Sequence, residues 1–356
     1  MANVQNQLIE FDKKIRLGWN TEGKTLREKR DIILEKLRTG FAEMRKEGKE
    51  VPSFSDFNQG SYQMDTGIWP ADGDYDIDVG LRFNCSKGDY ENPADLKILV
   101  ADVLEGHTVL GTKVKKSCVT VIYRLDGEQA YHVDLAVYAY EDPDSSQKRL
   151  FLAKGQRGSD EDNRWWEESD PQGLTTWVEN RFKDEQRAQF LRVIRALKRW
   201  KTEKFKTDGS NAPSGIGLTV AAGMWFQPEV HVDAYAGRTN VDDLRAMRTF
   251  VKKMVEQFQW IGVNEEDNSP LYRLTVQVPV APGLDIFERM SDGQMTTFRD
   301  RLVQLRDRLE EVTNEPDTVR ACQLMRQHFG EEFPVPDKKD TGSGGGRAIV
   351  SSGISA

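Results

Sequence analysis

The chain has 356 residues, and its 38% hydrophobic and 30% charged residues are typical of a soluble globular protein. The formal net charge of −8 argues against a protein built chiefly to coat nucleic acid, because such binding draws on an excess of Lys and Arg. No run approaches the roughly eighteen apolar residues that a membrane span needs, and the N-terminus lacks the pattern of a secretion signal. We therefore expect a cytoplasmic protein with no membrane partner and no stable nucleic-acid partner.

The first half of the chain combines helical and strand-like patterns. Apolar residues recur at helical intervals over residues 25–48, where Thr25 and Glu28 have the spacing of a capping box. The polar segment 141–173 is predicted to be a long connection, anchored by the packing of its tryptophans. The remaining predictions are a helix near 94–104, the tryptophan anchors Trp165 and Trp166, and strands near 54–61, 76–83, 117–125 and 130–141.

Helical patterns dominate the second half. Asn240, with Asp243 three residues on, marks the start of one of the helices. The predicted helices cover residues 177–205, 214–226, 242–258 and 294–312, with a strand near 272–279. We therefore expect an α+β protein of two lobes with the site in the cleft between them. The expected parts are an N-terminal α/β catalytic lobe with a long bracing helix (1–175), a mostly helical C-terminal lobe (176–337) and a flexible tail (338–356).

Three aspartates lie in two of the predicted strands. Residues 76–83 alternate polar and apolar side chains, so Asp76 and Asp78 project from the same face. Residues 131–140 alternate in the same way around Asp134. If the two strands are neighbours, three carboxylates converge, and such hard oxygen ligands suit Mg²⁺, with Mn²⁺ as an alternative. Two ions about 3.5–4 Å apart can clamp the attacking hydroxyl and the leaving pyrophosphate of a nucleotidyl transfer.

A Gln-Gly-Ser sequence precedes the aspartates. Gly60 has no side chain to block a phosphate, and Ser61 can offer both its backbone N–H and its hydroxyl to a triphosphate oxygen. A Gly-Ser pair alone is usually a turn, and an isolated Asp-x-Asp is usually a solvated strand face. The order of Gly-Ser, Asp-x-Asp and a third strand-borne aspartate in one chain favours nucleotidyl transfer over these simpler interpretations.

These motifs resemble the signature of the polymerase-β-like nucleotidyltransferases, and residues 60–66 and 74–80 resemble the bacterial cGAS/DncV-like nucleotidyltransferases (CD-NTases) of CBASS anti-phage systems. The resemblance covers roughly residues 20–310. It implies a polymerase-β-like core with a helical C-terminal lobe. The activity it implies is synthesis of a cyclic di- or trinucleotide second messenger from NTPs, with two Mg²⁺ ions and release of pyrophosphate. The implied metal ligands and catalytic residues are Asp76, Asp78 and Asp134.

The resemblance also implies nucleotide contacts on both walls of a cleft. Lys198 and Ser214 would contact the donor triphosphate, with Gln59 and Ser61 on the opposite wall. Lys198 lies in residues 181–206, which hold ten basic but only three acidic residues. A solvated helix face accounts for most of the arginines, whereas a lysine at the edge of an apolar stripe is well placed to neutralise phosphate.

Two alternatives and one further partner remain open. A nucleotidyltransferase of the same fold could act on RNA or on a protein, and a catalytically silent relative could serve as a nucleotide or RNA sensor. Some members of the resembled family carry a C-terminus that a ubiquitin-activating-like partner attaches to targets. This chain ends at Ala356, where glycine is the more usual acceptor, so tail conjugation stands as a hypothesis.

Overall fold

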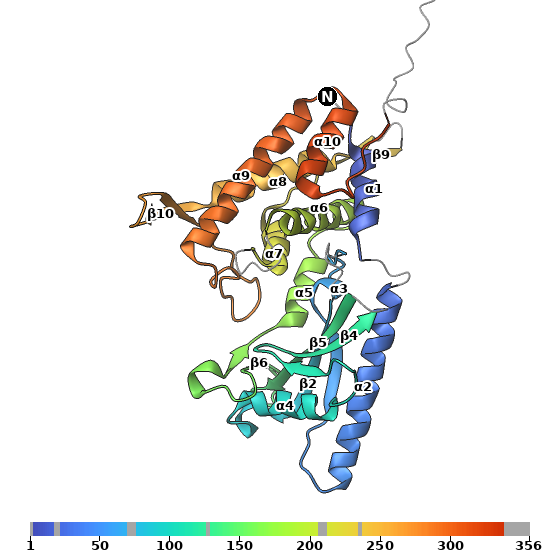
Figure 1. Ribbon diagram of the computed structural model, residues 1–356, viewed down its shortest axis with the longest axis vertical. Helices are drawn as coiled ribbons and strands as arrows, with labels where there is room; N and C mark the ends of the chain where they lie inside the picture. The colour runs from blue at the N-terminus through green and yellow to red at the C-terminus, as the bar shows by residue number, and fades with distance from the viewer. Residues whose placement is uncertain are drawn as a thin grey trace, which may run out of the picture.

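The computed structural model describes residues 3–17, 22–69, 76–125, 129–205, 212–233 and 237–337. Figure 1 shows two lobes, one built around a sheet and one built of helices. The expected α+β class is confirmed. None of the described helices is long and apolar enough to cross a membrane. The predicted tail, 338–356, lies outside the described residues.

A mixed seven-stranded sheet forms the core of the first lobe, with strand order β1-β2-β5-β4-β3. Strands β2 (Asp76–Ser86) and β5 (Gln129–Tyr140) pair in parallel at its centre. Strand β6 pairs with the C-terminal end of β5 and with β7. Every pairing in this sheet other than that of β2 with β5 is antiparallel. The remaining strands are β1 (Phe54–Asn58), β3 (Thr112–Val114), β4 (Val119–Leu125), β6 (Leu150–Lys154) and β7 (Trp165–Glu168).

The two faces of the central strands have different environments. In β2 the fully buried Ile77, Val79 and Leu81 belong to one apolar cluster with side chains of α2 (Glu22–Lys46) and α4 (Pro93–Val103). Side chains alternate across a strand, so the intervening Asp78 projects from the other face, away from these helices. Packing of the helices on one face therefore leaves the aspartate face toward the second lobe.

The second lobe is arranged around α6 (Asp184–Lys204), which contacts α1, α7, α8 and α10. Leu8, Phe11 and Ile15 of α1 (Gln5–Ile15) are buried in the core of this helical lobe. Helix α1 therefore belongs to the helical lobe. The boundary predicted at residue 175 places it in the first lobe instead. The other helices are α5 (Pro171–Glu179), α7 (Gly215–Trp225), α8 (Asp243–Gln257), α9 (Asp292–Asn314) and α10 (Thr318–Phe329).

Several predicted boundaries were wrong. The segment 141–173 is not a plain connection, because a short buried apolar run forms β6 and the tryptophans lie on β7. Trp166 packs against the sheet core and donates to the carbonyl of Tyr90 at 3.2 Å, as an anchor should. The single helix predicted over 177–205 is divided into α5 and α6, where Asp184 has a φ of 48°, outside right-handed helical geometry.

Other differences concern helix starts and short elements. Thr25 lies inside α2, so it is not an N-cap, and α8 is capped by Asp242, which accepts from Arg245 N at 2.9 Å. The strand predicted over 272–279 ends at Arg273, because Val276 N instead donates to the side chain of Asp285. Further elements that were not predicted are α1, α10, β3 and the hairpin strands β8 (Val230–Asp233), β9 (Arg238–Val241), β10 (Gln259–Val263) and β11 (Pro270–Arg273, part of the predicted strand).

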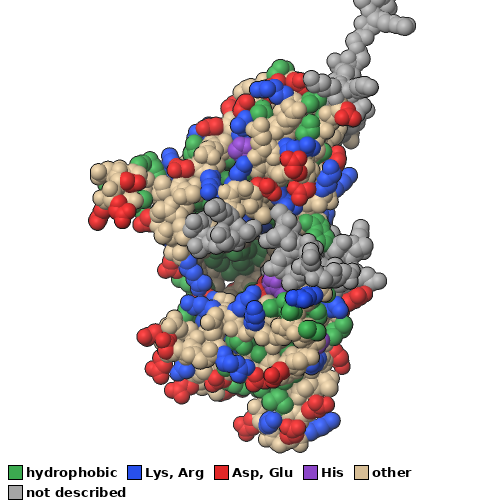
Figure 2. All heavy atoms as spheres, in the orientation of Figure 1, with side chains coloured by type: hydrophobic (Ala, Val, Ile, Leu, Met, Phe, Trp, Pro, Cys, Tyr) green, Lys and Arg blue, Asp and Glu red, His purple; other side chains and the backbone are tan. Residues whose placement is uncertain are grey.

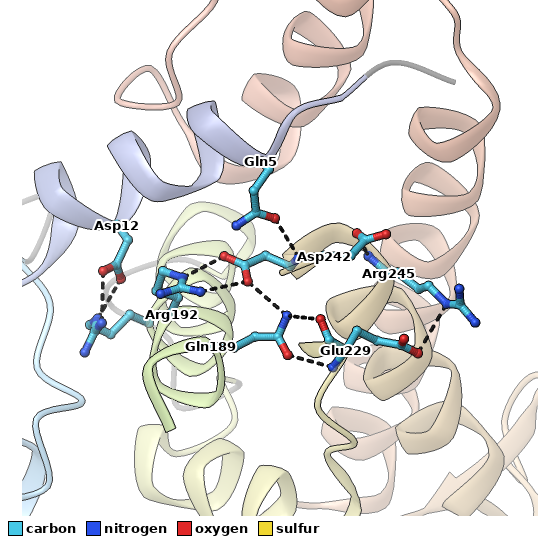
Figure 3. Close-up of polar contacts among 9 residues, drawn as sticks. Gln5, Asp12, Gln189, Arg192, Glu229, Asp242 and Arg245 are labelled. Carbon is cyan, nitrogen blue, oxygen red and sulfur yellow. Dashed lines mark hydrogen bonds and ion pairs between the residues drawn. The ribbon is translucent and has the colours of Figure 1, made fainter. Parts of the chain in front are cut away.

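Two arginines of α6 form ion pairs with acidic residues of other helices instead of facing solvent. Arg192 Nε donates to Asp243 Oδ2 at 2.7 Å, and Arg195 Nε donates to Asp12 Oδ1 on α1 at 2.7 Å (Figure 3). A second bond in each pair, at 3.0 and 2.9 Å, makes both contacts bidentate. These two arginines thus join α6 to α8 and α1.

Candidate active site

The parallel pairing of β2 with β5 places two aspartates side by side. Asp78 and Asp134 are direct register partners, so they lie on the same face of neighbouring strands, about 4.8 Å apart along the sheet. The backbone of Asp76 pairs with His132 two residues earlier, whereas its side chain is not among those that the structure describes. The expected convergence is therefore observed for two of the three carboxylates.

Asp134 is held by contacts with the next strand. Thr120, its register partner on β4, donates its hydroxyl to Asp134 Oδ1 at 2.5 Å. Two nitrogen atoms approach the carboxylate less closely, Lys115 Nζ at 4.0 Å and His132 Nε2 at 3.9 Å. Burial, together with the negative charge of Asp134, raises the pKa of Cys118 to about 12, so that this neighbour stays a neutral thiol. The carboxylate, only 16% exposed, has little freedom to move.

The Gly-Ser turn lies directly over Asp78. Gly60 has a φ of +69°, and a Cβ added to it would lie 1.9 Å from Asp78 Oδ2. Both the left-handed conformation and the close approach therefore require glycine. Gln59 N donates to the carbonyl of Asp78 at 3.2 Å, which fixes the start of α3 (Gly60–Gln63) over β2. The strand predicted over 54–61 thus ends at Asn58, and Ser61 lies in this short helix.

A cavity of about 490 Å³ lies between the lobes, beside the aspartates. Figure 2 shows the hollow that separates the two lobes on the face in view. The cavity brings together residues far apart in the sequence, including Gln59, Gly60, Ser61 and Asp78 from the sheet lobe and Lys198 from α6. Lys201, one turn after Lys198, also lines it and was not predicted. Asp134 lies on the neighbouring strand and does not itself line the cavity.

Lys198 is buried, with only 7% of its surface exposed. Its Nζ donates to both the carbonyl and the hydroxyl of Thr66, each at 2.9 Å. The first residue of α7 packs on its stem, since a Cβ on Gly215 would lie 3.4 Å from Lys198 Cε. Ser214 caps α7 by accepting from Gly217 N at 3.1 Å. Ser214 lines a second cavity of about 590 Å³, which adjoins the first through residues that line both, Pro171, Leu174 and Ile216.

Tyr138 is a second site residue that sequence reasoning missed. Its hydroxyl donates to Gln59 Oε1 at 2.9 Å, and its ring is 3% exposed beside the cavity. Burial raises the pKa of Tyr138 far above its ordinary value, and the negative charge of Asp78 adds to this effect. The available signal was the alternation of β5, which places Tyr138 on the same face as Asp134.

The donor set suits a hard cation. Asp78 and Asp134 present two carboxylates in register on adjacent strands, the oxygen chemistry that Mg²⁺ and Mn²⁺ prefer. Among the described side chains no group of three His, Cys, Asp or Glu is placed to hold a metal ion. Asp76 as the third ligand, and the metal itself, stay predictions.

Comparison with known proteins agrees with this geometry. Residues 54–138, from β1 through Tyr138, match the family model of the nucleotidyltransferase domain described as cyclic GMP-AMP synthase DncV-like. The expected resemblance to the DncV-like nucleotidyltransferases is confirmed. The matched residues contain Asp78, Asp134 and the Gly-Ser turn, which are the parts of the DncV-like domain that the structure gathers at the cleft.

Solved structures of DncV-like proteins share the whole fold. Vibrio cholerae DncV cyclic AMP-GMP synthase matches at 18% identity and a TM-score of 0.66, over 95% of this chain and 98% of that one. The same protein with a linear intermediate, 5′ pppA(3′,5′)pG, matches at 16% identity and 0.66, over 95% and 97%. Bradyrhizobium diazoefficiens CD-NTase CdnG in complex with GTP matches at 16% identity and 0.66, over 92% and 96%. These likenesses extend through the helical lobe.

Proposed function

We propose that this protein is a cyclic oligonucleotide synthase that joins NTPs and releases pyrophosphate. The observation that carries the proposal is the register of Asp78 and Asp134 on parallel strands, at the edge of a cavity whose opposite wall supplies Lys198. The DncV-like relatives, one a cyclic AMP-GMP synthase and another a CD-NTase bound to GTP, support the choice of NTPs as substrates and a cyclic product.

In the proposed reaction Asp76, Asp78 and Asp134 hold Mg²⁺, which when bound stabilises charge on the reacting phosphates. A ribose hydroxyl oxygen of one nucleotide bonds to the α-phosphorus of the donor, the bond to pyrophosphate breaks, and the hydroxyl proton passes to solvent. A second transfer of the same kind, within the linear product, closes the ring.

The protein groups around the cavity bind and orient the donor. Gly60 lets the turn approach Asp78 closely, and Ser61, which lines the cavity, supplies its N–H and hydroxyl to the triphosphate. Lys198 brings a positive charge to the opposite wall, and its bonds to Thr66 hold that charge at the cavity. Ser214 offers its hydroxyl from the adjoining cavity. Binding from two lobes fixes the angle of attack, which is the main requirement of phosphoryl transfer.

The cellular role we propose is production of a second messenger in anti-phage signalling from the cytoplasm. Its support is the resemblance of the motifs and the DncV-like domain match. Phage challenge of cells that carry the gene with its genomic neighbours, against the same cells with Asp78→Asn, tests that role. Covalent attachment of the tail is tested by mixing the protein with a ubiquitin-activating-like partner and looking for an adduct that depends on Ala356.

The direct test of the activity is incubation of purified protein with all four NTPs and Mg²⁺ or Mn²⁺, followed by phosphatase treatment and mass spectrometry. We expect a phosphatase-resistant product that is absent with Asp78→Asn. Incorporation of label only into added RNA or protein would replace this proposal by a nucleotidyltransferase with a macromolecular acceptor. Absence of any transfer, with nucleotide binding retained, would identify a silent sensor.

A further inference from the structure

A hydrogen bond links two distant segments beside the cavity. Tyr138 on β5 donates to Gln59 Oε1 at 2.9 Å, although the two residues lie 79 positions apart in the sequence. Gln59 lines the cavity at the residue before the Gly-Ser turn. The bond therefore connects a buried ring on β5 with a side chain that lines the cavity.

The direction of this bond follows from the number of hydrogens. A phenol hydroxyl carries one hydrogen, and an amide oxygen carries none, so Tyr138 must donate to Gln59. One lone pair of the Gln59 oxygen is thereby bonded on the protein side, and both N–H hydrogens of the amide are left to bond with a nucleotide in the cavity.

We propose that Tyr138 is a positioning residue that fixes the Gln59 amide as a hydrogen-bond donor toward an oxygen acceptor of the bound nucleotide. This inference rests on the proposed function, because it names how that site holds its substrate. The acceptor is a phosphate or ribose oxygen, since Gln59 N bonds to the carbonyl of Asp78 and the side chain starts directly over the reacting centre.

The direction of the hydrogen bond from Tyr138 to Gln59 does not change with pH near neutrality. Burial raises the pKa of Tyr138 far above its ordinary value, so the phenol keeps its hydrogen at neutral pH. A partner that could ionise would reverse or release the amide. Tyr138 provides a fixed direction that a solvent-exposed hydroxyl would not.

Two substitutions at Gln59 distinguish the orientation of its amide group from the volume of its side chain. Gln59→Glu keeps an oxygen for Tyr138 but turns an acceptor toward the nucleotide, whereas Gln59→Leu removes both bonds. We expect Gln59→Glu to bind nonhydrolysable NTP analogues more than tenfold more weakly than wild type, and more weakly than Gln59→Leu. Gln172→Glu on α5 is the matched control, because it makes the same charge change outside this cavity and keeps an oxygen for Arg82.

Tyr138→Phe tests the positioning role. Loss of one hydrogen bond is expected to weaken analogue binding by about fivefold and to raise KM with a smaller change in kcat. Tyr140→Phe, two residues along the same face of β5, is the control for loss of a hydroxyl. In a Gln59→Leu background Tyr138→Phe should have no further effect, which distinguishes positioning of Gln59 from a general contribution to folding.

The outcomes separate this inference from the proposed function. Gln59→Glu binding as tightly as wild type, or an unchanged Tyr138→Phe, would overturn the inference while wild-type synthesis stood. A Tyr138→Phe effect that persists in full in the Gln59→Leu background would overturn it as well. If the wild-type protein bound none of the NTP analogues, the proposed function and the inference would both fail.

Discussion

Replacement of Gly60 by alanine tests whether the turn and Asp78 form one unit. The added Cβ would lie 1.9 Å from Asp78 Oδ2, whereas real contacts begin at 3.0 Å, so the carboxylate or the turn must move by about 1.1 Å. A displacement of about 1 Å at reacting groups can cost about 100-fold in rate. We therefore expect Gly60→Ala to lower turnover by at least about 100-fold, through a misplaced carboxylate.

Gly48→Ala is a matched control. Gly48 also has a left-handed φ, +84°, but a Cβ added there would have no atom within 4 Å, so only the backbone cost remains. That cost is about 1–2 kcal/mol for an alanine, and each kcal/mol corresponds to roughly 2–4 °C in Tm for a protein of 150–250 residues. Both variants should lose a few degrees in a thermal melt, but only Gly60→Ala should lose product formation, measured by mass spectrometry. Wild-type turnover in folded Gly60→Ala would refute the reasoning.

Three further predictions follow from the described contacts. Thr120→Val removes the hydroxyl that donates to Asp134, and turnover should fall about 10- to 100-fold with a higher Mg²⁺ requirement, measured by Mg²⁺ titration of product formation; an unchanged titration would contradict a role in orienting the carboxylate. Lys198→Met removes the charge held at the cavity by Thr66, and nucleotide affinity measured by calorimetry should fall about tenfold or more, whereas equal affinity would exclude Lys198 from phosphate binding. Burial, with the charges of Lys204 and Arg308, lowers the pKa of His328 to about 4 from 6.5. Between those values the unfolded chain binds a proton that the folded protein does not, so stability is full above pH 6.5 and falls as pH drops toward 4. His328→Gln should therefore reduce the loss of Tm between about pH 7 and 5, and an unchanged loss would place its origin elsewhere.

The strand-borne parts of the site could be predicted because alternation is a local property. The pattern around Asp78 and Asp134 established which face each aspartate occupies, and their pairing needed only that the strands be neighbours. The sequence also predicted that residue 60 must be glycine, because a side chain there would block the approach of a phosphate. What the sequence did not show is that the same glycine is needed for contact with Asp78.

The parts that were missed depend on contacts between distant segments. Arg192 and Arg195 read as solvated charges on a helix, because their partners Asp243 and Asp12 lie 51 and 183 residues away. The pair between Arg195 and Asp12 also holds α1 in the helical lobe, and no local pattern encodes that placement. Tyr138 lay on the right face of β5, but its link to Gln59 spans 79 residues and becomes visible only in the fold.

The measurement that tests the central claim most directly compares product formation by wild type, Asp78→Asn and Asp134→Asn, with all four NTPs and Mg²⁺ and with thermal melts of the same preparations. Each substitution leaves the shape of the side chain intact and removes a charge from a pair that lies in register. We expect turnover to fall by several orders of magnitude in both variants, with Tm nearly unchanged. Near-normal synthesis by either folded variant would contradict the assignment of this aspartate pair as the catalytic centre.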